Sequence, residues 1–171
     1  VALLAEEKSA NRLKSKLAYY VKTGKLLRLR RGFYAKSGDY EPREFACKIY
    51  TPAYVSFETV LAKEGVIFQY YGTVFVASYL SRTIVTEKNR FVFRKMKNDL
   101  LVNQTGISDK GGYFEASKER ALLDMLYLTG NYYFDNLRGV DWEACLKLAP
   151  IYKLKNFENK IKDYQKKYAN Q

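Results

Sequence analysis

Apolar residues recur with a helical period near the start of the chain. Four of them follow the spacing i, i+4, i+7, i+8 and so share one stripe: Leu13, Leu17, Tyr20 and Val21. Ser9 can cap the first turn with its hydroxyl, and Gly24 can end the helix. The pattern predicts an amphipathic helix between Ser9 and Gly24.

An alternating pattern follows immediately. Leu27 and Leu29 alternate with Arg28 and Arg30, which predicts a strand with one apolar and one cationic face. The pair Arg31-Gly32 suits a tight turn, and residues 33–35 can return as a second short strand. A helix followed by a basic two-stranded ribbon is the outline of a winged helix-turn-helix.

The rest of the chain mixes helical and strand patterns behind a polar break at 37–42. We predict strands at 73–86 (one strand or a bent pair), 91–96, 100–102 and 113–116. We predict helices at 42–49, at 57–64 capped by Ser56, at 118–128 capped by Ser117, at 142–148 capped by Asp141, and near the C-terminus with Phe157, Ile161, Tyr164 and Tyr168 on one face. The expected fold class is α+β, with a winged helix-turn-helix at 1–38 and a mixed α/β domain at 39–171. Residues 1–8 look like the tail of a helix, so we expect the first helix of the winged domain to be truncated.

The positive charge is concentrated at the two ends of the chain. The formal net charge is +12, of which residues 1–36 carry +8, residues 37–148 carry zero and residues 149–171 carry +4. Proteins that bind polyanions concentrate their Lys and Arg residues in this way, whereas charge that serves only solubility is spread over the surface. A solvated basic face is the alternative interpretation, and it stays open for the C-terminal lysines, which could also contact DNA or an acidic partner.

The helix face opposite the apolar stripe is centred near Ser15. Arg can pair with guanine and Asn with adenine in bidentate geometry, so this face suits the major groove of double-stranded DNA. We expect bases to be read by Asn11, Arg12, Ser15 and Tyr19. We expect phosphates to be held by Lys14, Lys16, Lys22, Lys25, Arg28, Arg30 and Arg31.

Other chemistry has little support in the sequence. The chain has no histidine, and its two cysteines, Cys47 and Cys145, are far apart, so we expect no catalytic residues, no metal and no cofactor. Both cysteines are expected to be buried. No apolar run reaches about 18 residues and no signal-peptide pattern is present, so we expect a cytoplasmic protein without a membrane partner.

Three further patterns have structural explanations. Arg120 and Asp124 lie four residues apart on one predicted helix, which favours a solvated or partly buried ion pair over a carboxylate active site. Tyrosine pairs at 19–20, 70–71 and 132–133 suit packing better than stacking on single-stranded bases, with Tyr19 as the exception. Gly111-Gly112 indicates a turn, because no GK[ST] follows it.

Three segments in register resemble the AbiEi family of antitoxins. Residues 22–35 (KTGKLLRLRRGFYA) resemble the end of its winged helix, residues 54–61 (YVSFETVL) its "YvSleSAL" segment, and residues 117–127 (SKERALLDMLY) its "pEKALLDlly" helix. The resemblance covers nearly the whole chain. Ser117 stands where many members have Pro, and either residue suits the start of a helix.

The resemblance implies a type IV toxin–antitoxin system linked to abortive infection. The N-terminal domain would bind the promoter of its own operon and repress it. The C-terminal domain would oppose a nucleotidyltransferase-like toxin, often without stable direct contact, and its matching motifs look structural rather than chemical. Three alternatives stay open: a winged-helix regulator with a ligand- or partner-sensing domain, an RNA-binding or nucleotide-processing protein, and a protein that docks on anionic membranes.

Overall fold

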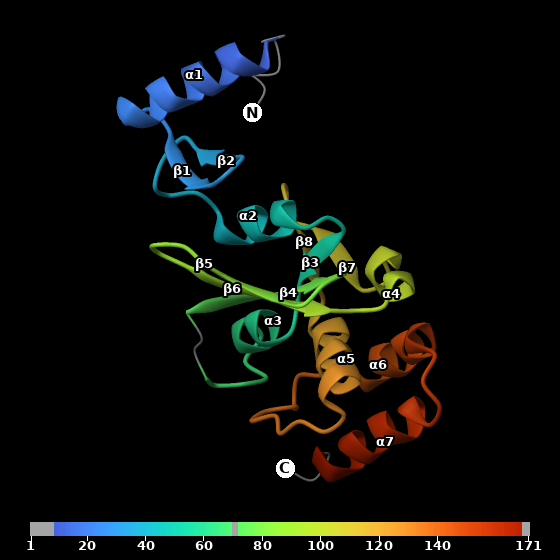
Figure 1. Cartoon of the computed structure of the whole chain (residues 1–171). Coiled ribbons are helices and arrows are strands. Elements are labelled where there is room, and N and C mark those ends of the chain that lie inside the picture. Colours follow the sequence, from blue (N-terminus) through green and yellow to red (C-terminus); the bar gives the residue numbers. More distant parts are fainter. Residues whose placement is uncertain (1–8, 70–71, 169–171) are drawn as a thin grey trace. The chain divides into compact units, whose positions relative to one another are not determined.

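The computed structural model describes residues 9–69 and 72–168, and these form an α+β fold with two β-sheets (Figure 1). The chain divides into two compact units, Val1–Glu41 and Pro42–Gln171. The helix tail expected at residues 1–8 lies outside the described residues. Among the described residues, no helix has both the length and the apolar character needed to cross a membrane.

The first unit contains the expected helix and ribbon. Helix α1 spans Ala10–Lys22, and the Ser9 hydroxyl accepts a hydrogen bond of 3.5 Å from the backbone N–H of Arg12, as the cap prediction requires. Strands β1 (Leu27–Arg30) and β2 (Phe33–Ala35) pair antiparallel. They turn at Gly32, whose φ of 86° lies in the region that glycine adopts without strain.

The second unit is built on a mixed six-stranded sheet with the order β5-β6-β4-β3-β8-β7. Its strands are β3 (Ala53–Val55), β4 (Thr73–Ser78), β5 (Arg82–Val85), β6 (Arg90–Lys95), β7 (Ile107–Asp109) and β8 (Phe114–Ala116). Residues 73–86 therefore form two strands, which is the second of the two possibilities that the sequence left open. β4 and β5 do not pair with each other, because β6 lies between them, parallel to β4 and antiparallel to β5.

The strand expected at 100–102 is wrong. Those residues belong to helix α4 (Asn98–Val102), in which the backbone N–H groups of Leu100 and Leu101 both bond to the carbonyl of Lys97. Both leucines are buried. Two adjacent buried side chains suit a helix end packed on the core, whereas a strand would turn them to opposite faces. Short apolar runs do not distinguish these possibilities by periodicity.

Helices cover both faces of the sheet. Helix α2 (Pro42–Ile49) lies on one face, and α3 (Glu58–Lys63) and α5 (Lys118–Thr129) lie on the other (Figure 1). Phe91 and Phe93 of β6 contact the rings of Phe45 and Tyr50 on the side of the sheet covered by α2. The next residue of β6, Arg94, points to the other side and forms an ion pair of 2.5 Å with Glu58 of α3. This is the alternation expected of a strand covered on both sides.

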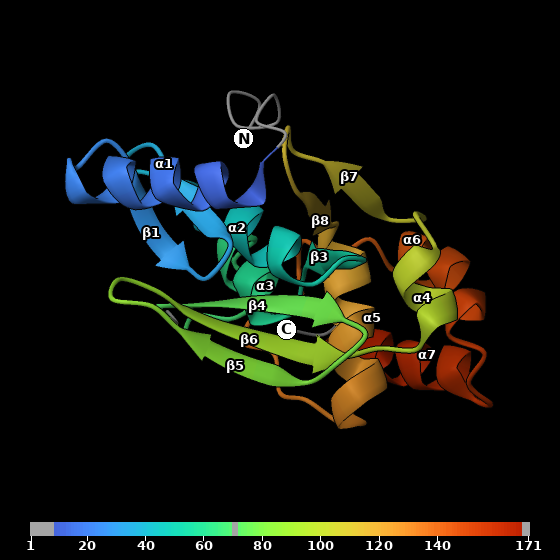
Figure 2. The same ribbon diagram turned by 45° about the horizontal axis from the view of Figure 1, so that its top comes forward.

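The C-terminal elements form a further layer outside α5. Helix α6 (Trp142–Leu148) packs against α5, and the 3-10 helix η2 (Ala149–Tyr152) and α7 (Phe157–Tyr168) follow it (Figure 2). Asp141 caps α6 and Ser117 caps α5, as expected. Cys47 and Cys145 are free and buried, and burial raises the pKa of both thiols to about 12, so neither is an activated nucleophile.

Candidate nucleic-acid interface

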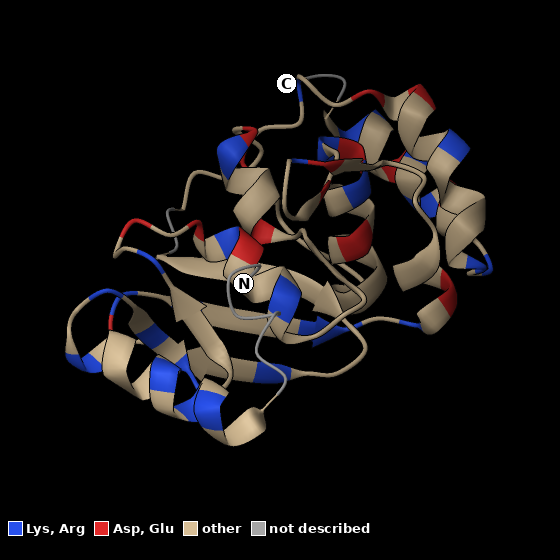
Figure 3. Ribbon diagram, turned by 90° about the horizontal axis from the view of Figure 1, so that it is seen from above, with Lys and Arg blue, Asp and Glu red and all other residues tan. Residues whose placement is uncertain are grey.

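The cationic residues of the first unit lie on the exposed side of its helix. The seven candidate contact residues of α1 are all exposed: Asn11, Arg12, Lys14, Ser15, Lys16, Tyr19 and Lys22. Figure 3 shows Lys and Arg along α1 and the ribbon. The Tyr19 side chain is 59% exposed. The predicted face is therefore exposed, and it carries the neutral residues Asn11, Ser15 and Tyr19 beside four cations.

One candidate has a local hydrogen-bond partner. The Ser15 hydroxyl donates to the backbone carbonyl of Asn11 at 3.1 Å. A hydroxyl bonded in this way offers only its oxygen to a base, as an acceptor. Ser15 therefore offers fewer hydrogen-bonding groups on this face than Arg12 and Asn11 do.

The apolar stripe of α1 lies away from these residues. Its four members are half-buried, and none of the α1 residues is buried. The backbone N–H of Leu26 bonds to the carbonyl of Tyr20 at 3.1 Å and so ties the ribbon to the end of the helix. The helix is thus amphipathic as predicted, and its polar side is the more accessible one.

The ribbon departs from the predicted alternation. A bulge between Arg28 and Arg30 sets Arg28 opposite Tyr34 and Arg30 opposite Phe33. One extra residue on β1 interrupts the two-residue period. Leu27 is exposed, and Arg30, beyond the bulge, is half-buried, so the prediction of one apolar and one cationic face is wrong for this strand. Lys25, Arg28 and Arg31 remain exposed.

The electrostatics of this segment are uniform. Residues 9–36 hold nine of the ten N-terminal cations and contain no Asp or Glu. No carboxylate of this segment can neutralise these cations in intramolecular ion pairs. Such a surface attracts phosphates, whose neutralisation releases counterions from DNA.

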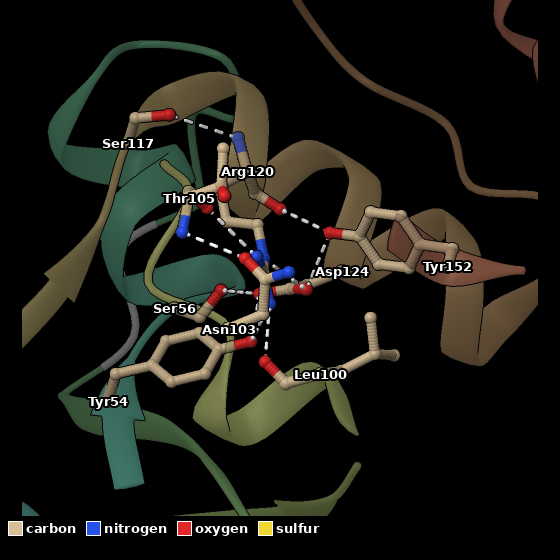
Figure 4. A network of polar contacts seen from close by, with 9 residues as sticks. All are labelled: Tyr54, Ser56, Leu100, Asn103, Thr105, Ser117, Arg120, Asp124 and Tyr152. Atoms are coloured by element: carbon tan, nitrogen blue, oxygen red, sulfur yellow. Dashed lines mark hydrogen bonds and ion pairs between the residues drawn. The ribbon is translucent and has the colours of Figure 1, made fainter. Parts of the chain in front are cut away.

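The second unit contains a buried polar network between α5 and the sheet (Figure 4). Arg120 and Asp124 form the predicted ion pair, at 3.2 Å between Nε and Oδ1. The expectation that solvent reaches it is wrong, since both side chains are 0% exposed. The Tyr152 hydroxyl donates to Oδ1 at 2.7 Å, and the hydroxyls of Tyr54 and Ser56 donate to Oδ2 at 3.0 and 2.8 Å.

The guanidinium of Arg120 joins further segments to this network. Its Nη1 donates to the carbonyl of Thr105 at 2.9 Å, and its Nη2 to the carbonyl of Leu100 and to the Tyr54 hydroxyl, at 2.9 and 3.0 Å. Burial raises the pKa of the Tyr54 and Tyr152 hydroxyls, so both stay protonated as donors. Burial also raises the pKa of Asp124, while the charge of Arg120 and the hydroxyl donors lower it.

This network is structural. Each group already has partners within the unit, and none of the five side chains is accessible to a substrate. It also corrects the cap predicted for α3: the Ser56 hydroxyl bonds to Asp124, and α3 begins after Phe57 without a side-chain cap. Tyr54, Ser56, Arg120 and Asp124 lie within two of the segments that resemble the AbiEi family, but nothing in the sequence indicates that they meet or that Tyr152 joins them.

Gly106 lies against this network. Its φ is 74°, and a Cβ there would lie 3.1 Å from Cβ of Arg120 and 3.3 Å from Leu148. Gly65 has a similar φ of 68° and nothing within 4 Å. Both alanine variants incur the left-handed backbone cost of about 1–2 kcal/mol. Only Gly106→Ala also crowds its neighbours, so it should lower the free energy of unfolding by about 1–2 kcal/mol more than Gly65→Ala does in urea denaturation. Equal losses in the two variants would contradict the close packing.

No protein-family model matches this sequence, and no curated protein matches it either. Among residues 9–69 and 72–168, no group of three or more acidic or cysteine side chains is placed to hold a metal ion.

Proposed function

We propose that this protein binds double-stranded DNA through α1 and the β1–β2 ribbon. The supporting observation is that the acid-free segment 9–36 presents its cations on the exposed side of a helix and on the ribbon that follows it. In this proposal residues 9–36 are the DNA-binding part of a winged helix. Helix α1 is the recognition helix and the ribbon is the wing.

The residue roles follow from exposure and chemistry. Arg12 and Asn11, near the N-terminus of α1, read base edges, with Ser15 and Tyr19 beside them. Phosphates are contacted by Lys14, Lys16, Lys22, Lys25, Arg28, Arg30 and Arg31. Arg30, being half-buried, contributes less than Arg28 and Arg31.

We further propose that the protein is an autorepressing antitoxin of the AbiEi type. The support is the resemblance of three segments, two of which contribute Tyr54, Ser56, Arg120 and Asp124 to one buried network. These motif residues would then maintain the packing of the second unit, which would counteract a nucleotidyltransferase-like toxin. Rescue of growth when the protein is co-expressed with the product of an adjacent toxin gene tests this half of the proposal.

A binding assay tests sequence-specific DNA recognition. Binding of the full chain to a labelled duplex from its own promoter is compared with binding to a scrambled duplex. Arg12→Ala should weaken promoter binding by about 5- to 150-fold, because a bidentate arginine–guanine contact contributes about 1–3 kcal/mol. Binding to the scrambled duplex should change much less.

The matched control is Arg82→Ala, which removes an exposed arginine from β5 of the second unit. It should leave both duplexes bound as in the native protein. If the native protein binds promoter and scrambled duplexes equally, α1 does not read sequence and the autorepressor proposal is wrong. If neither duplex binds, the basic segment serves another partner.

A further inference from the structure

The second unit has two adjoining hollows between α7 and the loop at 131–138. The first has a volume of about 460 Å³ and is lined by Tyr132 and Tyr133 of the loop and Tyr164 and Lys167 of α7, among others. The second, of about 300 Å³, is lined by Tyr168 of α7, by Phe68 and by residues 135–138 of the loop. Both volumes lie at the lower end of the range of small-molecule sites.

The loop is held firmly on α7. The Tyr164 hydroxyl accepts from the backbone N–H of Tyr132 and donates to its carbonyl, both at 2.9 Å. The buried ring of Phe134 packs against the rings of Tyr132 and Tyr164. The walls of the first hollow are therefore preformed and do not have to be ordered when a ligand binds.

Two aromatic rings at this site face solvent. Tyr133 is 72% exposed and Phe68 is 71% exposed, the two highest exposures among the aromatic side chains of the described residues. Packing within the unit does not account for the presence of either ring at the surface. Exposed rings beside a hollow are suited to stacking against a flat ligand, and every nucleobase has a π-face for this purpose.

A polar group at the second hollow is also unsatisfied. The Tyr168 side chain is 7% exposed, its ring stacks on that of Tyr164 with an interplanar angle of 3°, and its buried hydroxyl has no hydrogen-bond partner within the described residues. Buried hydroxyls in native proteins nearly always have a partner.

The charge of the C-terminal segment favours an anionic ligand. Residues 149–171 carry six lysines and two acids, and one of these acids, Asp163, lines the first hollow together with Lys167. Lys166 and Lys167 of α7 are both exposed, and Lys167 Nζ lies 5.4 Å from the ring centroid of Tyr168. Exposed rings interleaved with lysines match an unpaired base flanked by phosphates, a combination that an acidic peptide does not offer.

We propose that this aromatic groove binds single-stranded nucleic acid, with an unpaired base stacked on Tyr133 and the adjoining phosphates held by Lys166 and Lys167. RNA and single-stranded DNA share this chemistry. Its residues all belong to the second unit, and none of them takes part in the proposed duplex binding.

The test measures fluorescence anisotropy of labelled oligothymidylate and oligouridylate of about 12 nucleotides, a length within the span of known single-strand sites. The full chain is used in an Arg28→Ala/Arg30→Ala background, which weakens binding by the first unit. Tyr133→Ala should weaken binding by about 5- to 150-fold, the effect of losing one stacked base, while Tyr133→Phe keeps the ring and should bind within about twofold of its parent. Phe114→Ala, at another exposed ring of this unit, is the matched control and should bind as its parent does.

The charged half of the site has its own readout. Lys166→Ala/Lys167→Ala should reduce the dependence of log K on log salt by about 1.4, as expected for two phosphates of a single strand. Preference for one oligonucleotide identifies RNA or DNA as the better ligand. The proposal is overturned if Tyr133→Ala binds like its parent, if Tyr133→Phe is as weak as Tyr133→Ala, or if polyglutamate competes as well as unlabelled oligonucleotide.

Discussion

Replacing Asp124 by alanine is expected to lower the free energy of unfolding by about 3–5 kcal/mol. The substitution leaves the Arg120 guanidinium buried at 0% exposure without its counter-ion. It also removes the acceptor of three hydroxyls, those of Tyr54, Ser56 and Tyr152. Each uncompensated buried polar group adds a desolvation cost, so the loss exceeds that of one hydrogen bond.

Urea denaturation followed by circular dichroism measures this effect. Asp99→Ala is the matched control, because Asp99 also forms a 2.8 Å ion pair, with Lys153, but both side chains are more than 70% exposed. Solvent screens that pair, so its loss should change stability little. If Asp124→Ala were no more destabilising than Asp99→Ala, the buried network would not contribute to stability as the structure indicates.

A double-mutant cycle separates the pair from its surroundings. Arg120→Met and Asp124→Leu should each be strongly destabilising, because each leaves a charge or polar group without a partner. The double variant should lose clearly less than the sum of the two, since removing both charges also removes both desolvation costs. Additive losses would show that the two residues act independently.

Duplex binding by the native protein is expected to fall about 500-fold between about 50 and 200 mM salt. In the proposed complex about five cations of residues 9–36 engage phosphates on each protomer, which corresponds to a slope of log K against log salt between about −4 and −5. Such a slope arises from counterion release and is largely independent of DNA sequence. Promoter and scrambled duplexes should therefore show similar slopes.

Removing arginines of the ribbon should change this slope in a defined way. Arg28→Ala/Arg30→Ala should bring it about 2 nearer to zero and weaken both duplexes alike, if each arginine holds one phosphate. Because Arg30 is half-buried, a smaller change would assign the effect mainly to Arg28. Arg82→Ala, outside the proposed interface, should leave the slope unchanged. A flat salt response of the native protein would contradict the DNA-binding proposal.

Features governed by neighbours in the sequence could be predicted without the structure. Ser9, Ser117 and Asp141 each accept a bond from a first-turn N–H, and the helices begin directly after them as expected. The stripe of α1, the turn at Gly32 and the absence of acids from residues 9–36 are likewise local. The exposure of the candidate residues of α1 followed from periodicity and charge, whereas on the ribbon the predicted alternation failed and Arg30 is half-buried.

Features that depend on distant segments could not be predicted. The Arg120–Asp124 pair looks like a surface pair at i, i+4 spacing, and only the packing of β3, α4 and η2 around it makes it buried. The bulge in β1, the helical state of residues 98–102 and the position of β6 between β4 and β5 are decided by pairing and burial that no local pattern encodes. The groove beside Tyr133 exists because Tyr164 holds the 131–138 loop on α7 across 32 residues. The sequence alone thus determined where the charge lies and where the capped helices begin, whereas tertiary packing decided which polar side chains are buried in the core and which aromatic rings remain accessible.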